Sequence, residues 1–119
     1  MRNWYEKFRW FFTSNGKLVI GGKSAEQNEE VLKNHLDKDD LVMHTKQAGS
    51  PFSVIKNGKG INASEINEVA VFTVSFSRAW REGKKKAEIH IFKPEQIVKE
   101  KGQKKGTFAV LGKVQKASA

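Results

Sequence analysis

The residues best suited to bind a polyanion lie near the end of a long predicted helix. When the helical spacing of residues 63–82 is continued a few positions further, several cations fall on one face and Trp80 falls on the opposite face. An ordinary solvent-exposed face would mix charges of both signs, whereas Glu82 is the one acid in this stretch. We call the candidate phosphate contacts the basic stripe: Arg78, Arg81, Lys84 and Lys85.

A second candidate is the stretch Gly22-Lys23-Ser24, which matches the end of a nucleotide-binding P-loop. The first glycine of that motif should stand at position 17, which is a lysine, and residues 18–20 are an apolar run typical of a strand. The sequence therefore excludes a P-loop NTPase. Two readings remain open: a weak phosphate site beside Lys23 at a helix N-terminus, or a plain strand-to-helix turn.

Catalytic and metal chemistry have little support. His35, His44 and His90 are not in metal-ligand spacing, the chain has no cysteine, and no paired carboxylates accompany them. We interpret His35 and His90 as structural. His44 ends a predicted strand beside the polar loop at residues 45–51, so it is either a ligand contact or a loop anchor. We predict no catalytic residue, no metal and no cofactor.

Charge points to the class of partner. The chain has 119 residues, 22 lysines and arginines against 13 acids, a net charge of +9 and a pI near 9.9. Residues 1–77 carry 10 basic and 9 acidic side chains, while residues 78–119 carry 12 and 4. This asymmetry favours nucleic acid over a merely soluble cationic surface. No apolar run could span a membrane and no secretory signal is recognisable, so we expect a cytoplasmic protein with no membrane partner.

The elements that would position these residues alternate in type. We expect a hairpin turning at residues 14–17, a helix at about 24–36, strands at 41–44, 52–56, 87–92 and 107–111, and a second helix at about 63–82. The valines within 68–76 also suit a buried strand, so periodicity favours the helix only moderately. The spacing predicts one α+β domain over residues 1–119, with a mainly antiparallel sheet and a frayed tail at 113–119.

Half of the aromatic residues stand within the first twelve positions. Six so close together could form a platform on which bases stack, or could simply pack the hairpin and the core. We favour packing. The six are Trp4, Tyr5, Phe8, Trp10, Phe11 and Phe12.

Several motifs together resemble the NFACT-R family of RNA-binding domains. The stretch WYEKFRWFFTSNGKLVIGGKSAEQNEE is similar to the family's opening pattern, and HTKQAGSPFSVIKN, FSRAW, FKPEQIVKEKG and GTFAVLGK also match it. The resemblance covers nearly the entire chain. Many members carry H-A-D-[LI]-H-G where this chain has HTKQAG at residues 44–49, so the acid and the second histidine of that motif are absent.

The resemblance implies an RNA-binding domain related to the C-terminal domain of factors that tail stalled chains in ribosome quality control. It also supports the helical interpretation of residues 63–82. The tailing activity is not carried over, because this chain has none of the other parts of those factors. The matching positions join Lys46 of the same loop as candidates for the RNA-facing surface: Lys23, Gln27, Asn28, His44, Gly49 and Lys56.

The sequence therefore supports two main hypotheses. The first is a stand-alone, non-enzymatic module that binds tRNA or rRNA through phosphate contacts and works with ribosomal or tRNA-processing proteins. The second is an enzyme, or a subunit of one, acting on RNA with His44 near the chemistry. A protein-binding adaptor on the ribosome is a weaker third.

Overall fold

The computed structural model describes residues 3–45, 52–75, 88–98, 109–110 and 115–118. In these ranges the chain forms one six-stranded antiparallel sheet in the order β1-β2-β4-β3-β5-β8, and a separate β6–β7 pair. The strands are β1 (Arg9–Phe12), β2 (Leu18–Gly21), β3 (Leu41–Thr45), β4 (Ser53–Ile55), β5 (Glu88–Phe92), β6 (Ile97–Val98), β7 (Ala109–Val110) and β8 (Gln115–Ser118). The helices are α1 (Ala25–Asn34), α2 (Ala63–Ser75) and two short 3₁₀ turns, Trp4–Lys7 and Pro94–Gln96.

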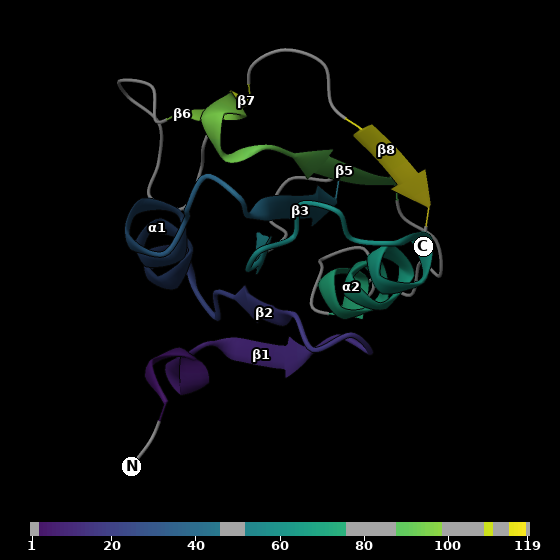
Figure 1. Ribbon diagram of the computed structural model, residues 1–119. Coiled ribbons are helices and arrows are strands. Elements are labelled where there is room, and N and C mark those ends of the chain that lie inside the picture. The colour runs from purple at the N-terminus through teal and green to yellow at the C-terminus, as the bar shows by residue number, and fades with distance from the viewer. Residues whose placement is uncertain (1–2, 46–51, 76–87, 99–108, 111–114, 119) are drawn as a thin grey trace.

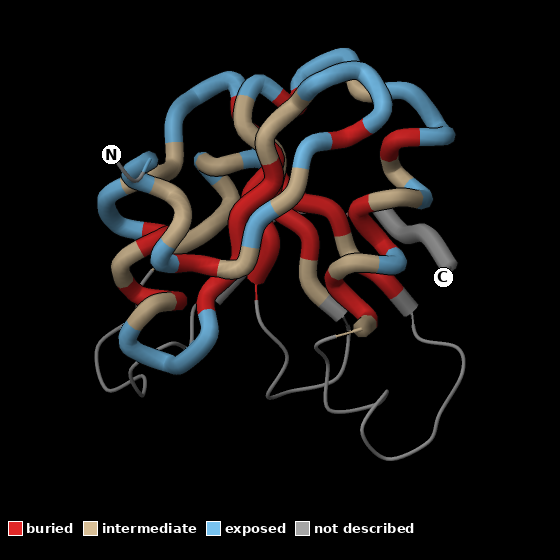
Figure 2. Tube along the Cα trace, turned by 90° about the horizontal axis from the view of Figure 1, so that it is seen from below, coloured by how far each residue is buried: buried red, intermediate tan, exposed pale blue. Residues whose placement is uncertain are grey.

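The two α-helices cover opposite faces of the sheet, as Figure 1 shows. Neighbouring strand residues point to opposite faces, so each central strand contributes to two cores. The core beneath α1 contains Ile20, Val42 and Val54, and the core beneath α2 contains Val19 and Met43 with further residues of the same strands. The central strands are buried on both faces, and Figure 2 shows them as the buried centre of the chain. The predicted α+β class is confirmed.

The first hairpin forms as the sequence predicted. Its turn includes Gly16, whose φ of +80° is a conformation that glycine adopts without strain. The turn is held against α2 by two acids of that helix. Glu65 accepts hydrogen bonds from Thr13 (Oγ1 to Oε2, 2.5 Å) and Asn15 (3.0 Å), and Glu68 accepts two from Ser14.

Residues 63–75 are helical, which decides between the two structures that periodicity allowed. Asn62 accepts a hydrogen bond from the Glu65 amide at 2.8 Å and so caps the helix N-terminus. Thr73, a β-branched residue that also suits a strand, donates its hydroxyl to the Val69 carbonyl at 2.8 Å within the helix. Val71, which the helical arrangement places away from the core, is exposed. Residues 76–82 of the predicted helix lie outside the described residues.

The end of the chain differs from the expectation. We expected residues 113–119 to fray, and Gln115–Ser118 instead form β8, which pairs with β5. The reason is that β5 would otherwise leave a row of backbone donors and acceptors unpaired at the sheet edge, and β8 satisfies them. Ala109–Val110 form β7 within the predicted strand 107–111, whose other residues lie outside the described part.

Candidate nucleic-acid interface

One end of the sheet brings together residues that stand far apart in the sequence. Strand β2 ends there, β3 ends there at His44 and Thr45, and β4 begins there after Phe52. The rings of His44 and Phe52 are stacked, with centroids 4.2 Å apart and planes at 20°. The Phe52 amide donates to the side-chain oxygen of buried Asn28 at 3.4 Å. Two predicted site residues, His44 and Asn28, thus meet at Phe52, which the sequence analysis did not single out.

His90 of β5 lies directly opposite His44 of β3 in the sheet register. Side chains of such cross-strand partners stand next to one another on the same face of a sheet. Both imidazoles are partly buried, and His90 also contacts Phe92 edge to face, with ring centroids 6.2 Å apart. The sequence predicts a structural role for His90. The strict alternation in residues 88–92 could have shown that His90 shares the face of Phe92, but only the strand register places it beside His44.

The Gly22-Lys23-Ser24 corner is a strand-to-helix turn whose polar groups are engaged. Ser24 caps α1 by accepting a hydrogen bond from the Gln27 amide at 3.2 Å. The Gln27 side chain accepts from the Lys23 amide at 2.8 Å and donates to the Lys7 carbonyl at 3.1 Å. The amide of Lys23, which a phosphate site at this corner would use, is therefore occupied. In this structure Gln27 ties the corner to the N-terminal segment.

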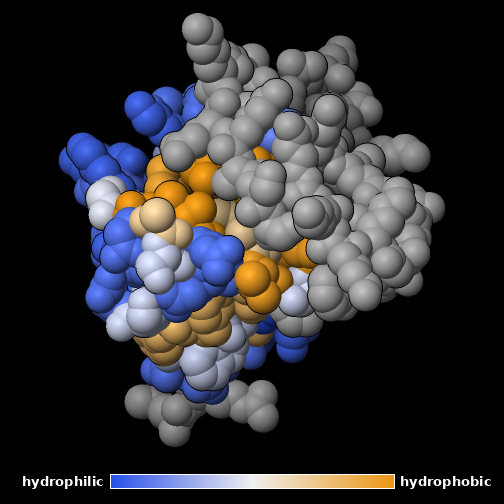
Figure 3. All heavy atoms as spheres, turned by 90° about the vertical axis from the view of Figure 1, so that its right-hand side faces the viewer, coloured by the Kyte–Doolittle hydropathy of each residue, from blue (hydrophilic) through white to orange (hydrophobic). Residues whose placement is uncertain are grey.

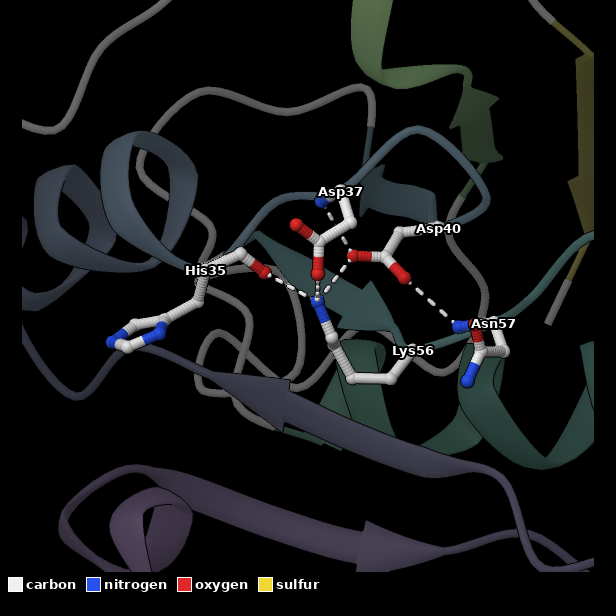
Figure 4. Close-up of polar contacts among 5 residues, drawn as sticks. All are labelled: His35, Asp37, Asp40, Lys56 and Asn57. Atoms are coloured by element: carbon white, nitrogen blue, oxygen red, sulfur yellow. Dashed lines mark hydrogen bonds and ion pairs between the residues drawn. The ribbon is translucent and has the colours of Figure 1, made fainter.

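Lys56 lies in a network of carboxylates beside the C-terminus of α1, shown in Figure 4. Its ammonium donates to the His35 carbonyl at 2.8 Å, to Asp37 at 2.8 Å and to Asp40 at 2.5 Å. Asp40 also accepts from the amides of Asp37 and Asn57, both at 2.8 Å. An ammonium group has three N–H donors. All three have partners within the fold here, and the predicted RNA contact of Lys56 stays a prediction.

The pKa values in this network follow from its geometry. Burial acts to lower the pKa of Lys56, but the hydrogen bonds and charges of Asp37 and Asp40 outweigh burial and raise that pKa above its ordinary value. The hydrogen bond and charge of Lys56 lower the pKa of Asp37. The Lys56 side chain is 17% exposed and that of Asp40 only 1%, so the pair is mostly removed from water.

The remaining candidate residues lie outside the described residues: Lys46, Gly49, Arg78, Arg81, Lys84 and Lys85. The flanking elements are placed. The last turn of α2 reaches the end of the sheet just described, since the hydroxyls of Thr73 and Ser53 are 2.8 Å apart, and β5 begins at Glu88 beside the end of β3. The segment that carries the basic stripe is therefore attached at both ends close to His44.

The described residues show neither a metal site nor a membrane-spanning helix. Within them, no three histidine or acidic side chains are grouped so as to hold a metal ion. Likewise, none of the helices in the described part of the chain is both long and apolar enough to cross a membrane.

Comparison with known proteins identifies relatives over most of the chain. The family model described as the NFACT protein RNA binding domain matches residues 7–112. A relative from Methanocaldococcus jannaschii, the archaeal Rqc2 homolog aRqcH, is 47% identical over 116 residues, which cover 93% of this chain and 17% of that protein. The human ribosome quality control complex subunit NEMF is 37% identical over 79 residues, 65% of this chain and 7% of that protein.

A solved structure shares the fold. The C-terminal part of the fibronectin/fibrinogen-binding protein from Streptococcus suis superimposes with a TM-score of 0.83 over 93% of this chain and 44% of that one, at 19% identity. At that identity the likeness concerns the fold alone. This chain spans less than a fifth of the length of the two curated relatives described above.

Proposed function

This chain belongs to the family of NFACT protein RNA-binding domains, and from that membership we propose that it binds tRNA or rRNA without altering it. The observation that carries the proposal is the convergence at one end of the sheet. His44 lies there, and α2 ends and β5 begins there, on either side of the segment that contains the basic stripe. The segment between α2 and β5 contains the basic stripe, and clustered cations suit phosphate binding.

In this proposal the phosphate backbone supplies most of the affinity. The side chains of the basic stripe and Lys46 neutralise phosphates, and Lys23 and His44 add further contacts. Such contacts position a protein on RNA by charge and shape and do not read the base sequence. The excess of 12 basic over 4 acidic residues in 78–119 supports this mode of binding.

The human relative is by name a subunit of the ribosome quality control complex, and we propose that this domain supplies an RNA contact in that process. The partner would be tRNA or rRNA on the ribosome, with ribosomal proteins nearby. The remainder of those relatives has no counterpart in the 119 residues here, so the proposal concerns RNA binding alone.

A second candidate function is an enzyme acting on RNA. The observation that favours it is the pairing of His44 with His90, because two adjacent imidazoles could share the roles of general base and general acid. Incubation of the protein with end-labelled tRNA distinguishes the two functions. Retention of intact tRNA on a filter supports the binding module, and cleavage or modification that is lost in His44→Ala supports the enzyme. If tRNA and rRNA fragments are neither retained nor changed, the proposed function is wrong.

A further inference from the structure

The N-terminal aromatic residues divide into two groups with different surroundings. Phe8 is buried in the core beneath α1, and Phe11 packs on Phe72 of α2 with ring centroids 4.8 Å apart. The other group remains at the surface. Trp4 is 49% exposed, Trp10 41% and Phe12 49%. Packing, the interpretation that the sequence favoured, accounts for Phe8 and Phe11 but not for these three.

The exposed group forms a contiguous surface centred on Tyr5. The Tyr5 ring contacts Trp4, Trp10 and Phe12 edge to face, with centroids 5.7, 5.1 and 5.9 Å apart, and Trp10 contacts Phe12 at 6.0 Å. Trp4 in turn is stacked on His35 at the end of α1, with centroids 4.7 Å apart. We call Trp4, Tyr5, Trp10 and Phe12 the aromatic shelf.

The fold explains why the shelf is open to solvent. Trp10 and Phe12 pair with Ile20 and Leu18 in the register of β1 and β2, so they share the sheet face that α1 covers. Strand β1 is the edge of the sheet, and the cover of α1 does not extend over these side chains. The register of the paired strands therefore fixes the face of the sheet on which Trp10 and Phe12 lie.

From this arrangement we infer that the aromatic shelf stacks unpaired bases of RNA. The inference deepens the proposed function and rests on it. Exposed aromatic rings offer a flat surface to any base, and base stacking on such rings is tolerant of sequence.

Acids near the shelf have partners within the fold. Glu6 accepts a hydrogen bond from the side-chain amide of Asn3 at 3.4 Å. Glu30, whose carboxylate lies beside His35, is neutralised by an ion pair with Lys7, and the pKa of Glu30 is lowered chiefly by that hydrogen bond. A protein partner that buried the shelf would be expected to bring aliphatic side chains and acids. A nucleotide brings a flat ring and a phosphate.

The other exposed apolar residue among the large side chains described provides a control. Val71, on α2, is 55% exposed and lies on the opposite side of the sheet from the shelf. Figure 3 views that side, on which apolar residues also reach the surface. Val71→Ala removes exposed apolar area without touching the shelf.

The test measures binding of three fluorescently labelled probes of equal length, about 12 nucleotides, which is within the usual site size for single strands. The probes are a single-stranded oligouridylate, an abasic ribose-phosphate oligomer with the same charge, and a blunt RNA duplex. We expect the protein to prefer the oligouridylate to the abasic oligomer. Trp10→Ala and Phe12→Ala should each weaken oligouridylate binding by roughly 5- to 100-fold, and Val71→Ala should leave it unchanged.

Two further measurements test whether a loss of binding comes from lost stacking. One excludes damage to the fold, and the other excludes loss of a charged contact. Circular dichroism and thermal unfolding of each variant should match the wild type, and Trp10→Phe should retain part of the affinity. The dependence of affinity on salt should keep its slope in Trp10→Ala, because an uncharged side chain releases no counterion.

The possible results separate this inference from the proposed function. Suppose that the protein binds tRNA, that it binds the oligouridylate and the abasic oligomer equally, and that the shelf variants change neither affinity. Base stacking is then wrong, and a protein partner becomes the remaining ligand for the shelf. If the protein binds no RNA probe at all, the proposed function is wrong as well.

Discussion

Gly22 lies so close to Asn28 that a Cβ built on the glycine would stand 2.7 Å from both the backbone nitrogen and the side-chain oxygen of Asn28. The nitrogen belongs to the helix backbone, and the side-chain oxygen is buried and accepts a hydrogen bond from the Phe52 amide. The first turn of α1 can therefore approach the end of β2 only because residue 22 has no side chain. The same Asn28 oxygen accepts from the Phe52 amide, and the Phe52 ring stacks on His44.

Gly22→Ala should destabilise the protein by about 1–3 kcal/mol, as overpacking in a rigid site does. Gly21→Ala is the matched control, because its nearest neighbour would be the Phe52 carbonyl oxygen at an ordinary 3.4 Å. Urea unfolding of the two variants provides the measurement. Equal stability of both variants would show that the corner adjusts freely.

His44→Phe should keep the stability of the protein and lose RNA affinity. Phenylalanine can preserve the stack on Phe52, whereas it has no nitrogen to contact RNA. His44→Ala should lose both, with about 0.5–1.5 kcal/mol of stability from the missing ring pair. Thermal unfolding and tRNA titration of the same preparations provide the measurement. Normal RNA binding by folded His44→Phe would limit His44 to a structural role.

Lys56→Met should destabilise the protein by about 2–3 kcal/mol, since it leaves the carboxylate of Asp40 buried without its cation. Lys7→Met, which breaks the partly exposed pair with Glu30 of α1, should cost under about 1 kcal/mol. Chemical unfolding compares the two. RNA affinity measured where Lys56→Met is still folded should equal that of the wild type, and a reduced salt slope would instead return Lys56 to the RNA surface.

The stability of the protein should fall in acid partly through Glu65. Hydrogen bonds from Thr13 and then Asn15 lower the pKa of Glu65 in the folded state. A lowered folded pKa stabilises the protein above the unfolded value of about 4.3, and this contribution is lost as pH falls through the folded pKa. Denaturant midpoints between about pH 6 and pH 2.5 should therefore decline less steeply in Glu65→Gln than in the wild type. Parallel curves would contradict this.

Changing Arg78, Arg81 and Lys85 to glutamine should flatten the slope of log affinity against log salt by about two units, because each phosphate contact contributes roughly 0.7–0.9. The loss should be similar for different RNA sequences. Lys33→Gln, Lys38→Gln and Lys59→Gln together remove three exposed cations elsewhere and form a matched control for a general loss of charge. Titration against tRNA at several salt concentrations measures the slope, and an unchanged slope would leave the stripe as a solvated surface.

Local signals in the sequence were sufficient for most of the elements. The cap at Ser24, the turn at Gly16 and the cap at Asn62 each depend on residues within a few positions, and each forms as expected. Strand β8 could not be predicted in the same way, because Gln115–Ser118 is polar and pairs only where β5 offers an edge.

The site was less accessible to sequence reasoning because its contacts are between distant positions. Nothing near Lys56 in the chain shows that Asp37 and Asp40 will surround its ammonium. The stack of His44 on Phe52 and the pairing of His44 with His90 depend on strand register, which alternation alone does not fix. The exposure of the aromatic shelf likewise depends on tertiary structure, because α1 does not extend over the side chains of β1.

The strand order has a consequence for how this chain folds. The β1–β2 hairpin joins neighbours in sequence and can form early, whereas the β2–β4 and β3–β5 pairs close long stretches of chain. Strand β8 can add only to an existing β5, so its pairing should be the last to form and the first to open. Amide hydrogens of Gln115–Ser118 should then exchange through local opening, while those of β2 and β4 exchange only when the whole domain unfolds.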